Sequence, residues 1–179
     1  MRYCACSHRL YNEGENMSLT THPYRYFSDK RKFLSVWKKT LTALRNDKIE
    51  CVYGIWDIIA GRWFEDGPML VKLSKDIISV KVHSEKYLAI GVNDILPEDK
   101  PVWFDETQKD EIKGLDWTED LEWREYDAVK GSFGNAVCEI ELIEADSAYG
   151  LLGLSFLLKG GGKLCLEDIG DVISASYKQ

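Results

Sequence analysis

The sequence predicts a fold of the α+β class that is mostly antiparallel β, with an N-terminal amphipathic helix followed by two similar β-meander halves. Three observations predict this fold. Apolar residues recur at spacings of three and four between residues 28 and 46, which is typical of a helix. Short apolar runs bounded by Gly, Pro and Asp follow, as expected of strands. A second set of runs repeats the first at an offset near 80 residues, which indicates an internal repeat.

The helix is predicted at residues 28–46, where one face is apolar and most of the other face is basic. Ser28 or Asp29 is the predicted N-cap, because either side chain can accept a hydrogen bond from the first free backbone amides. The apolar face contains Phe33, Leu34, Trp37, Leu41 and Leu44. The basic residues are Lys30, Arg31, Lys32, Lys38, Lys39 and Arg45.

The first half, residues 49–93, is predicted to contain five short strands joined by turns such as Asp66-Gly67-Pro68. In one of them Ile78, Val80 and Val82 fall on a single face, as in a half-buried strand. The predicted strands are Ile49–Ile59, Arg62–Phe64, Met69–Leu73, Ile77–Val82 and Tyr87–Val92.

The second half, residues 128–179, is predicted to contain four strands, with a hairpin turn at Lys159-Gly160-Gly161-Gly162. The strands are Ala136–Ile143, Leu151–Leu158, Lys163–Glu167 and Asp171–Ser176. The likeness of the two halves has two explanations that the sequence leaves open. Either one meander was duplicated, or two unrelated antiparallel meanders share a similar pattern.

Between the halves lies an acidic connector, residues 94–127, with 13 Asp/Glu and four Lys/Arg, in a chain whose net charge is −7. Pro97, Pro101 and Gly114 interrupt it, and a short helix is predicted around Trp117–Tyr126. This concentration of negative charge repels nucleic acid and anionic membranes and attracts basic proteins. Its aromatic side chains are predicted to pack on the body of the protein or on a partner. They are Trp103, Phe104, Trp117 and Trp123.

Residues 1–16 are predicted to be a polar tail, and residues 17–179 a single β-rich domain. The N-terminus lacks the apolar segment of a secretory signal, and no apolar run approaches the roughly 20 residues of a membrane span. We therefore expect a cytoplasmic protein. The five cysteines are odd in number and scattered, which argues against a disulfide framework. Cys51, Cys138 and Cys165 lie in strand-like runs and are predicted to be buried free thiols.

No pattern in the sequence predicts catalysis, a metal site or a cofactor. Cys4-x-Cys6-x-His8 lacks the fourth ligand and paired spacing of a structural zinc site, so the tail interpretation is preferred to metal binding. Of the three histidines, only His83 falls in the predicted strands, and no nucleophile motif stands near it. The glycines of the predicted hairpin turn lack the Lys-Ser/Thr pair of a phosphate-binding loop. We therefore expect a protein that is not an enzyme.

Four features resemble immunity proteins of bacterial contact-dependent and polymorphic toxin systems. They are Trp56-Asp57 at a strand, Asp66-Gly67-Pro68 before an apolar strand, the acidic-aromatic stretch Asp116–Tyr126, and Gly170-Asp171-Val172-Ile173-Ser174 near the end. The resemblance covers roughly residues 50–176 and points to no particular family of immunity proteins. It implies a non-enzymatic protein that binds a cognate toxin, commonly a nuclease with a basic active site, and blocks its access to substrate.

The predicted function is accordingly the binding and neutralisation of a basic toxin through the acidic connector, with carboxylates for steering and tryptophans as anchors. Two other functions remain open. A small-ligand-binding or hydrolytic β-barrel-like protein would have a deep apolar pocket, and a structural or oligomerising domain would have a large apolar symmetric surface. The predicted partner-binding residues are Glu106, Asp110, Glu111, Asp116, Trp117, Glu119, Asp120, Glu122 and Trp123.

Overall fold

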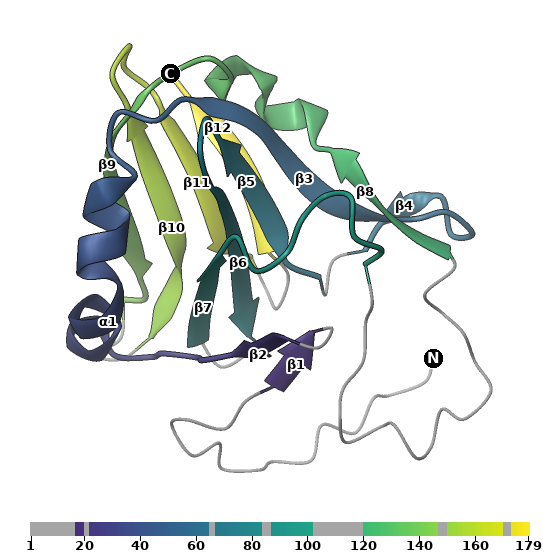
Figure 1. Ribbon diagram of the computed structural model, residues 1–179, viewed down its shortest axis with the longest axis horizontal. Coiled ribbons are helices and arrows are strands. Elements are labelled where there is room, and N and C mark those ends of the chain that lie inside the picture. Colours follow the sequence, from purple (N-terminus) through teal and green to yellow (C-terminus); the bar gives the residue numbers. More distant parts are fainter. Residues whose placement is uncertain are drawn as a thin grey trace.

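Two antiparallel sheets face each other in the computed structural model of the chain, and a helix lies along one edge (Figure 1). The structure describes residues 17–19, 22–64, 67–83, 87–101, 120–146, 150–169 and 173–179. The first part of the chain forms β1 (Met17–Leu19), β2 (His22–Tyr24), α1 (Lys30–Ala43), β3 (Ile49–Asp57), β4 (Arg62–Trp63), β5 (Met69–Leu73), β6 (Ile77–His83) and β7 (Tyr87–Val92). The rest forms β8 (Leu121–Glu125), the 3-10 helix η3 (Asp127–Ser132), β9 (Val137–Glu144), β10 (Leu151–Leu158), β11 (Lys163–Asp168) and β12 (Ile173–Lys178).

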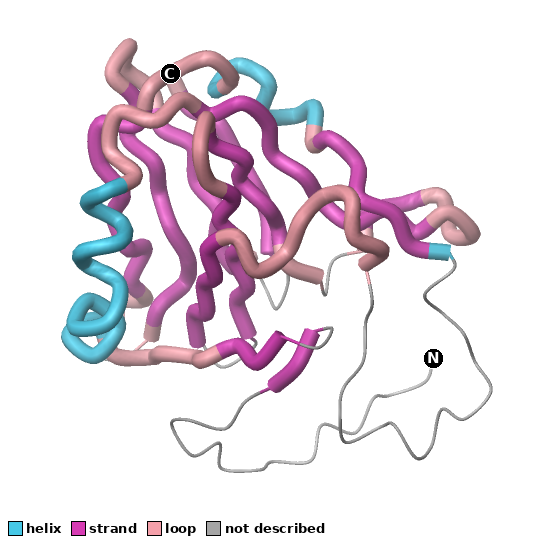
Figure 2. The backbone as a smooth tube through the Cα atoms, viewed as in Figure 1, coloured by secondary structure: helices cyan, strands magenta, loops and turns pink. Residues whose placement is uncertain are grey.

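Each sheet is built around an antiparallel meander. The first sheet has the order β4-β3-β5-β6-β7, with β8 also paired to β3, and the second has the order β12-β11-β10-β9. β1 and β2 pair with each other in a separate two-stranded sheet. Strands make up most of the described chain, and α1 and η3 lie at its margins (Figure 2). The prediction of a mostly antiparallel β fold with one helix near the N-terminus is confirmed.

The core lies between the two sheets, because alternate residues of each strand point inward. Ile78 and Val80 of β6 are fully buried, and Val82 packs against the same cluster. Phe156 of β10 and Leu164 of β11 belong to this cluster on the opposing sheet. The predicted single-faced pattern of β6 is therefore confirmed, and fully burying such side chains stabilises the fold by about 1.5–3 kcal/mol each.

The helix α1 begins where the sequence predicts. Asp29 is the N-cap, and its side chain accepts a hydrogen bond of 2.8 Å from the backbone N–H of Lys32. Phe33 is completely buried and packs edge-to-face on Phe27, with ring centroids 5.6 Å apart. After the helix, the Asn46 N–H donates to the Val137 carbonyl at 2.8 Å. This bond joins the end of α1 to the start of β9.

The short helix predicted around Trp117–Tyr126 is wrong for most of its described residues, because Leu121–Glu125 form the strand β8. Glu and Arg favour helices, but β3 offers a row of backbone partners, and tertiary context overrides such intrinsic propensities. β8 pairs with β3 from Leu121 opposite Asp57 to Glu125 opposite Tyr53. The prediction that Trp103, Phe104 and Trp117 pack on the protein or on a partner falls outside the described residues.

Two smaller predictions also differ from the structure. Ile58 and Ile59 were expected to continue β3, but they form the turn before β4. Cys51 and Cys165 are buried as predicted, whereas Cys138 is exposed. Leu157 and Leu158 of β10 face Glu139 and Val137, so Cys138 is the extra residue of a β-bulge on an edge strand, and such a residue is left unpaired.

The beginning of the connector crosses the outer face of the first sheet. Its Ile95 forms a small buried cluster with Leu70 and Ala89. The Asp94 carboxylate accepts a hydrogen bond of 2.9 Å from the Ser79 hydroxyl. A Cβ atom on Gly91 would lie 1.8 Å from this carboxylate, so only glycine lets the connector lie so close to the sheet.

Candidate functional site

We define the β4–β8 end as residues 54–64 and 120–126. β3 connects it to the core, because its first residues pair with β5 and its last residues pair with both β8 and β4. In Figure 1 these three strands extend to the right, past the strands of the second sheet. The side chains at the ends of these strands away from the core therefore lie beyond it. Aromatic residues there pack mainly on other residues of the β4–β8 end.

Aromatic rings gather on one face of the β4–β8 end. Trp56 of β3 stands opposite Trp63 of β4, and their rings meet edge-to-face at 5.2 Å. The Trp63 ring also contacts Tyr126, at 4.8 Å between centroids. The Arg124 guanidinium lies over the Trp56 ring at 4.6 Å and is held there by an ion pair with Glu122. All three aromatic side chains are half-buried, so this cluster remains partly accessible.

A pocket of about 160 Å³ opens beside this cluster, between the β4–β8 end and the end of the second sheet. A Cβ on Gly67 would lie 2.6 Å from the Ile55 side chain, so this glycine permits the close packing of the pocket wall. The aliphatic and aromatic side chains of its lining include Ile55, Trp63, Phe64, Tyr126, Ile169 and Ile173. The lining is thus mainly aliphatic and aromatic.

Apolar side chains are also exposed around this region. Ile58 is 48% exposed and Ile59 is 76% exposed, both in the turn between β3 and β4. Ile169, which lines the pocket, is 60% exposed. Single exposed apolar residues are common, but several of them at one end of a fold are typical of an interaction surface.

The predicted site residues fall into two groups. Asp120, Glu122 and Trp123 belong to the β4–β8 end, with Trp123 packed on the buried cluster of the outer face of the first sheet. That packing makes Trp123 part of the body of the protein. The others lie outside the described residues: Glu106, Asp110, Glu111, Asp116, Trp117 and Glu119.

Sequence reasoning missed the residues that define the aromatic surface, namely Trp56, Trp63, Arg124 and Tyr126. The signal that could have found them is the spacing of Trp56 and Trp63 around the Ile58–Gly61 turn. A two-strand hairpin across this turn places both rings on one face. Arg124 and Tyr126 join them only because β8 is a strand, which the sequence did not predict.

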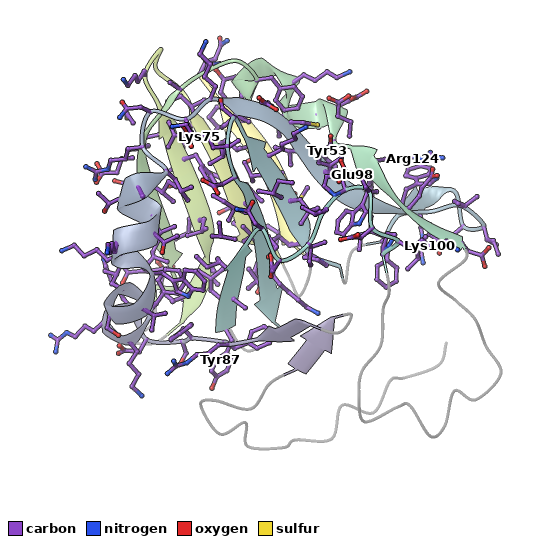
Figure 3. The ribbon with its side chains drawn as sticks, in the orientation of Figure 1. Tyr53, Lys75, Tyr87, Glu98, Lys100 and Arg124 are labelled. Atoms are coloured by element: carbon purple, nitrogen blue, oxygen red, sulfur yellow. The ribbon has the colours of Figure 1, made fainter. Side chains whose placement is uncertain are left out.

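A group of titratable side chains lies on the outer face of the first sheet, at the junction of β3 and β8. The Cys51 thiol lies 3.1 Å from a Glu125 carboxylate oxygen. Burial, together with this hydrogen bond, raises the pKa of Cys51 to about 12. Burial also raises the pKa of Tyr53 to about 12, with smaller contributions from Cys51, Glu125 and Glu98. Tyr53 and Glu98 lie in the same part of the molecule (Figure 3). Both the thiol and the phenol are therefore protonated at neutral pH, and Cys51 is a poor nucleophile.

A second depression lies at the opposite edge, where α1 runs beside β9. This groove has a volume of about 460 Å³, and Leu34 and Ile140 contribute to its lining. Ion pairs cross it near both ends, from Lys30 to Glu144 at 2.5 Å and from Arg45 to Glu139 at 2.8 Å. Lys30 and Arg45 therefore pair with carboxylates of β9.

Among the described residues, no group of His, Cys, Asp and Glu side chains is arranged to hold a metal ion. The Cys4, Cys6 and His8 cluster lies outside them. Within the same described ranges, no helix has the length and apolar character needed to cross a membrane.

Comparisons with protein-family models, with curated proteins and with solved structures found no match. The function is therefore inferred from the residues of the site.

Proposed function

We propose that this chain is a non-enzymatic cytoplasmic binding protein of the immunity type, which recognises a basic partner at the β4–β8 end and neutralises a toxin. The observation that supports this most directly is the coincidence of exposed isoleucines, an aromatic surface and acidic segments at one end of the fold. Aromatic and aliphatic anchors supply affinity, and surrounding carboxylates steer a cationic partner.

The charge of the surrounding segments favours a basic partner. The β4–β8 end itself, residues 54–64 and 120–126, contains four Asp/Glu and two Arg. The acidic connector adds to the same sign of charge. A potential of this kind raises the association rate of a positively charged protein and discourages acidic ones.

We also infer that the two halves descend from one duplicated meander. The strand orders β3-β5-β6-β7 and β9-β10-β11-β12 support this inference, because each is four consecutive antiparallel neighbours apart from the inserted β4. The first sheet would then have acquired β4 and β8, and with them the proposed binding surface, while the second sheet retained the simple meander.

The product of the neighbouring gene provides a direct test. We expect its coexpression with this chain to suppress any growth inhibition that it causes, and the two purified proteins to associate less tightly as the salt concentration rises. Replacing two acids of the β4–β8 end, Asp120→Lys with Glu122→Lys, should weaken association roughly tenfold, since charge pairs near an interface contribute on this scale.

A matched control separates local charge from net charge. Glu141→Lys in β9 with Asp146→Lys just after that strand makes the same change in total charge, and Glu141 likewise belongs to an exposed ion pair, with Lys163. This control should alter affinity by less than about threefold. Equal weakening by both double variants would contradict a site at the β4–β8 end. Absence of association with the neighbouring product would contradict the immunity role.

A further inference from the structure

We propose that the open edge of β8 pairs with β8 of a second copy of this chain, antiparallel and about a two-fold axis at Trp123. The pairing joins the first sheets of the two copies into one continuous sheet. This inference goes beyond the proposed function and does not depend on it, because the occupant of the edge is a second copy of the chain and not a toxin.

One edge of β8 is open for pairing. The strand pairs with β3 along its whole length without a bulge, and no described strand pairs with its other side. In Figure 1 β8 lies at the margin of the drawn molecule. An unpaired edge of this kind presents a row of backbone donors and acceptors, which is a template for pairing with another chain.

Two hydrogen bonds show which backbone groups of β8 face this edge. The Tyr126 N–H donates to the Val52 carbonyl and the Ile58 N–H donates to the Asp120 carbonyl, both at 2.7 Å. Residues along an antiparallel strand bond to a given neighbour alternately, so the even-numbered residues of β8 bond to β3. The N–H and C=O groups of its odd-numbered residues therefore point to the open edge: Leu121, Trp123 and Glu125.

Two other sheet edges are protected against such pairing. The edge strand β7 exchanges backbone hydrogen bonds with Phe27 at Leu88, both of 2.9 Å. The edge strand β9 has a bulge at Cys138, and α1 lies beside it (Figure 1). Bulges and covering segments are common means of keeping an edge from pairing with another chain. β8 is regular, and no described segment bonds to its open edge.

The charges of β8 select one register of self-pairing. With Trp123 opposite Trp123 of the second copy, Glu122 lies opposite Arg124 on both sides of the axis, and Leu121 lies opposite Glu125. Every outward backbone group of the strand then has a partner, and opposite charges face each other across the strands, which is stabilising. Moving the axis by one residue in either direction would place Glu122 opposite itself or Arg124 opposite itself. The sequence of β8 is therefore complementary to its own reverse in charge.

The charged side chains of this contact are already held in position. Arg124 and Glu122 form an ion pair, with 47% and 41% of their side chains exposed, so both are accessible to a second copy. Arg124 also lies over the Trp56 ring, which restricts its rotamers, so less side-chain entropy is lost when a second Glu122 approaches. Across the axis, the two pairs form an alternating network of carboxylates and guanidiniums.

Charge reversal in β8 tests both the pairing and its register. Sedimentation equilibrium of the full chain, from about 10 μM to about 1 mM, suits a small and weak interface. The apparent mass should rise from 20.5 kDa toward twice that value. Glu122→Arg places like charges opposite each other at Arg124, and Arg124→Glu does so at Glu122. Each variant should therefore weaken self-association roughly tenfold.

An equal mixture of the two variants should associate again. In the mixed pair, every arginine at position 122 or 124 of one chain faces a glutamate of the other, so the complementary charges are restored. Both variants should remain folded, because exposed ion pairs contribute little to stability. Glu141→Arg is the matched control, since it breaks an exposed ion pair with Lys163 on the second sheet and should leave self-association unchanged.

Amide hydrogen exchange tests the backbone contacts directly. The N–H groups of Leu121, Trp123 and Glu125 should exchange severalfold more slowly as the chain concentration rises, because pairing gives them acceptors. The N–H groups of Glu122 and Arg124 already bond to β3 and should show no such dependence on concentration.

The outcomes bear on this inference alone. A chain that stays monomeric up to about 1 mM would overturn it and leave the proposed toxin binding untouched. Self-association that survives both single variants would show that the copies meet at another surface. Failure of the mixture to associate, while each variant remains folded and monomeric, would overturn the register centred on Trp123.

Discussion

The two edges of the molecule differ in how their surface charges are used. At the α1 edge the groove is the larger depression, about 460 Å³, but ion pairs cross it near both ends. At the β4–β8 end the pocket is smaller, about 160 Å³, and is bordered by exposed isoleucine and half-buried aromatic rings. The volume of a depression is therefore not enough to identify a binding site. In the α1 groove the charged side chains already form ion pairs with each other, so fewer of them are available to bind a partner.

If the α1 edge is structural and the β4–β8 end is functional, substitutions at the two should reduce stability to different extents. Phe33→Ala should lower the free energy of unfolding by about 3–5 kcal/mol, because it leaves a cavity in the core. Trp56→Ala should cost roughly 1–2 kcal/mol, because that ring is only partly buried and loses less buried area. Urea denaturation of both variants measures the difference. A larger loss for Trp56→Ala would place the β4–β8 end in the structural core and reverse the comparison.

Alkaline pH tests the junction that joins the β4–β8 end to the core. The pKa of Cys51 rises from 9.0 to about 12 on folding, so the unfolded chain releases its proton first as the pH increases. The stability due to the protonated thiol is therefore complete below pH 9 and is lost as pH rises toward 12, on the order of 1 kcal/mol for each pH unit.

The measurement is the free energy of unfolding of Cys51→Ser as a function of pH. This variant should lose stability less steeply above pH 9 than the parent chain does. Tyr53→Phe should have a smaller effect of the same sign that begins nearer pH 10, the ordinary pKa of tyrosine. Parallel profiles for Cys51→Ser and the parent would show that the thiol is not responsible.

The smallest effect is expected from the ion pairs of the α1 edge. Arg45 and Glu139 are each about half exposed, and such pairs contribute roughly 0–1 kcal/mol. A double-mutant cycle with Arg45→Ala and Glu139→Ala should give a coupling energy in that range, decreasing with added salt. A coupling energy well above 2 kcal/mol would mean that these ion pairs stabilise the contact between α1 and β9 much more than their exposure suggests.

Most of the framework could be predicted from the sequence, because local pattern determines it. Asp29 before an apolar face at helical spacing predicts both the start of α1 and the face it buries. Alternation of Ile78, Val80 and Val82 predicts the inward face of β6, and Gly160–Gly162 predicts the hairpin between β10 and β11. Each of these signals lies within a few residues of the structure it predicts.

The candidate site could not be predicted in the same way, because it depends on contacts between distant segments. Arg124 reaches Trp56 only after β8 pairs with β3, some 70 residues earlier in the chain. The sequence around β8 is rich in Glu and Trp and favours a helix on local grounds. The prediction therefore found the acidic character of the region but missed its strand geometry, its aromatic face and its pocket.

β3 has one further consequence. Its nine residues form one strand from Ile49, inside the core, to Asp57 at the outer hairpin, with one irregularity in its pairing between Ile49 and Cys51. A load applied to that hairpin therefore reaches the centre of the sandwich along a single strand. Binding of a partner at the tip of the hairpin would thus restrain the core of the protein. Pulling the complex apart by force would then act against part of the free energy of unfolding as well as against the free energy of binding.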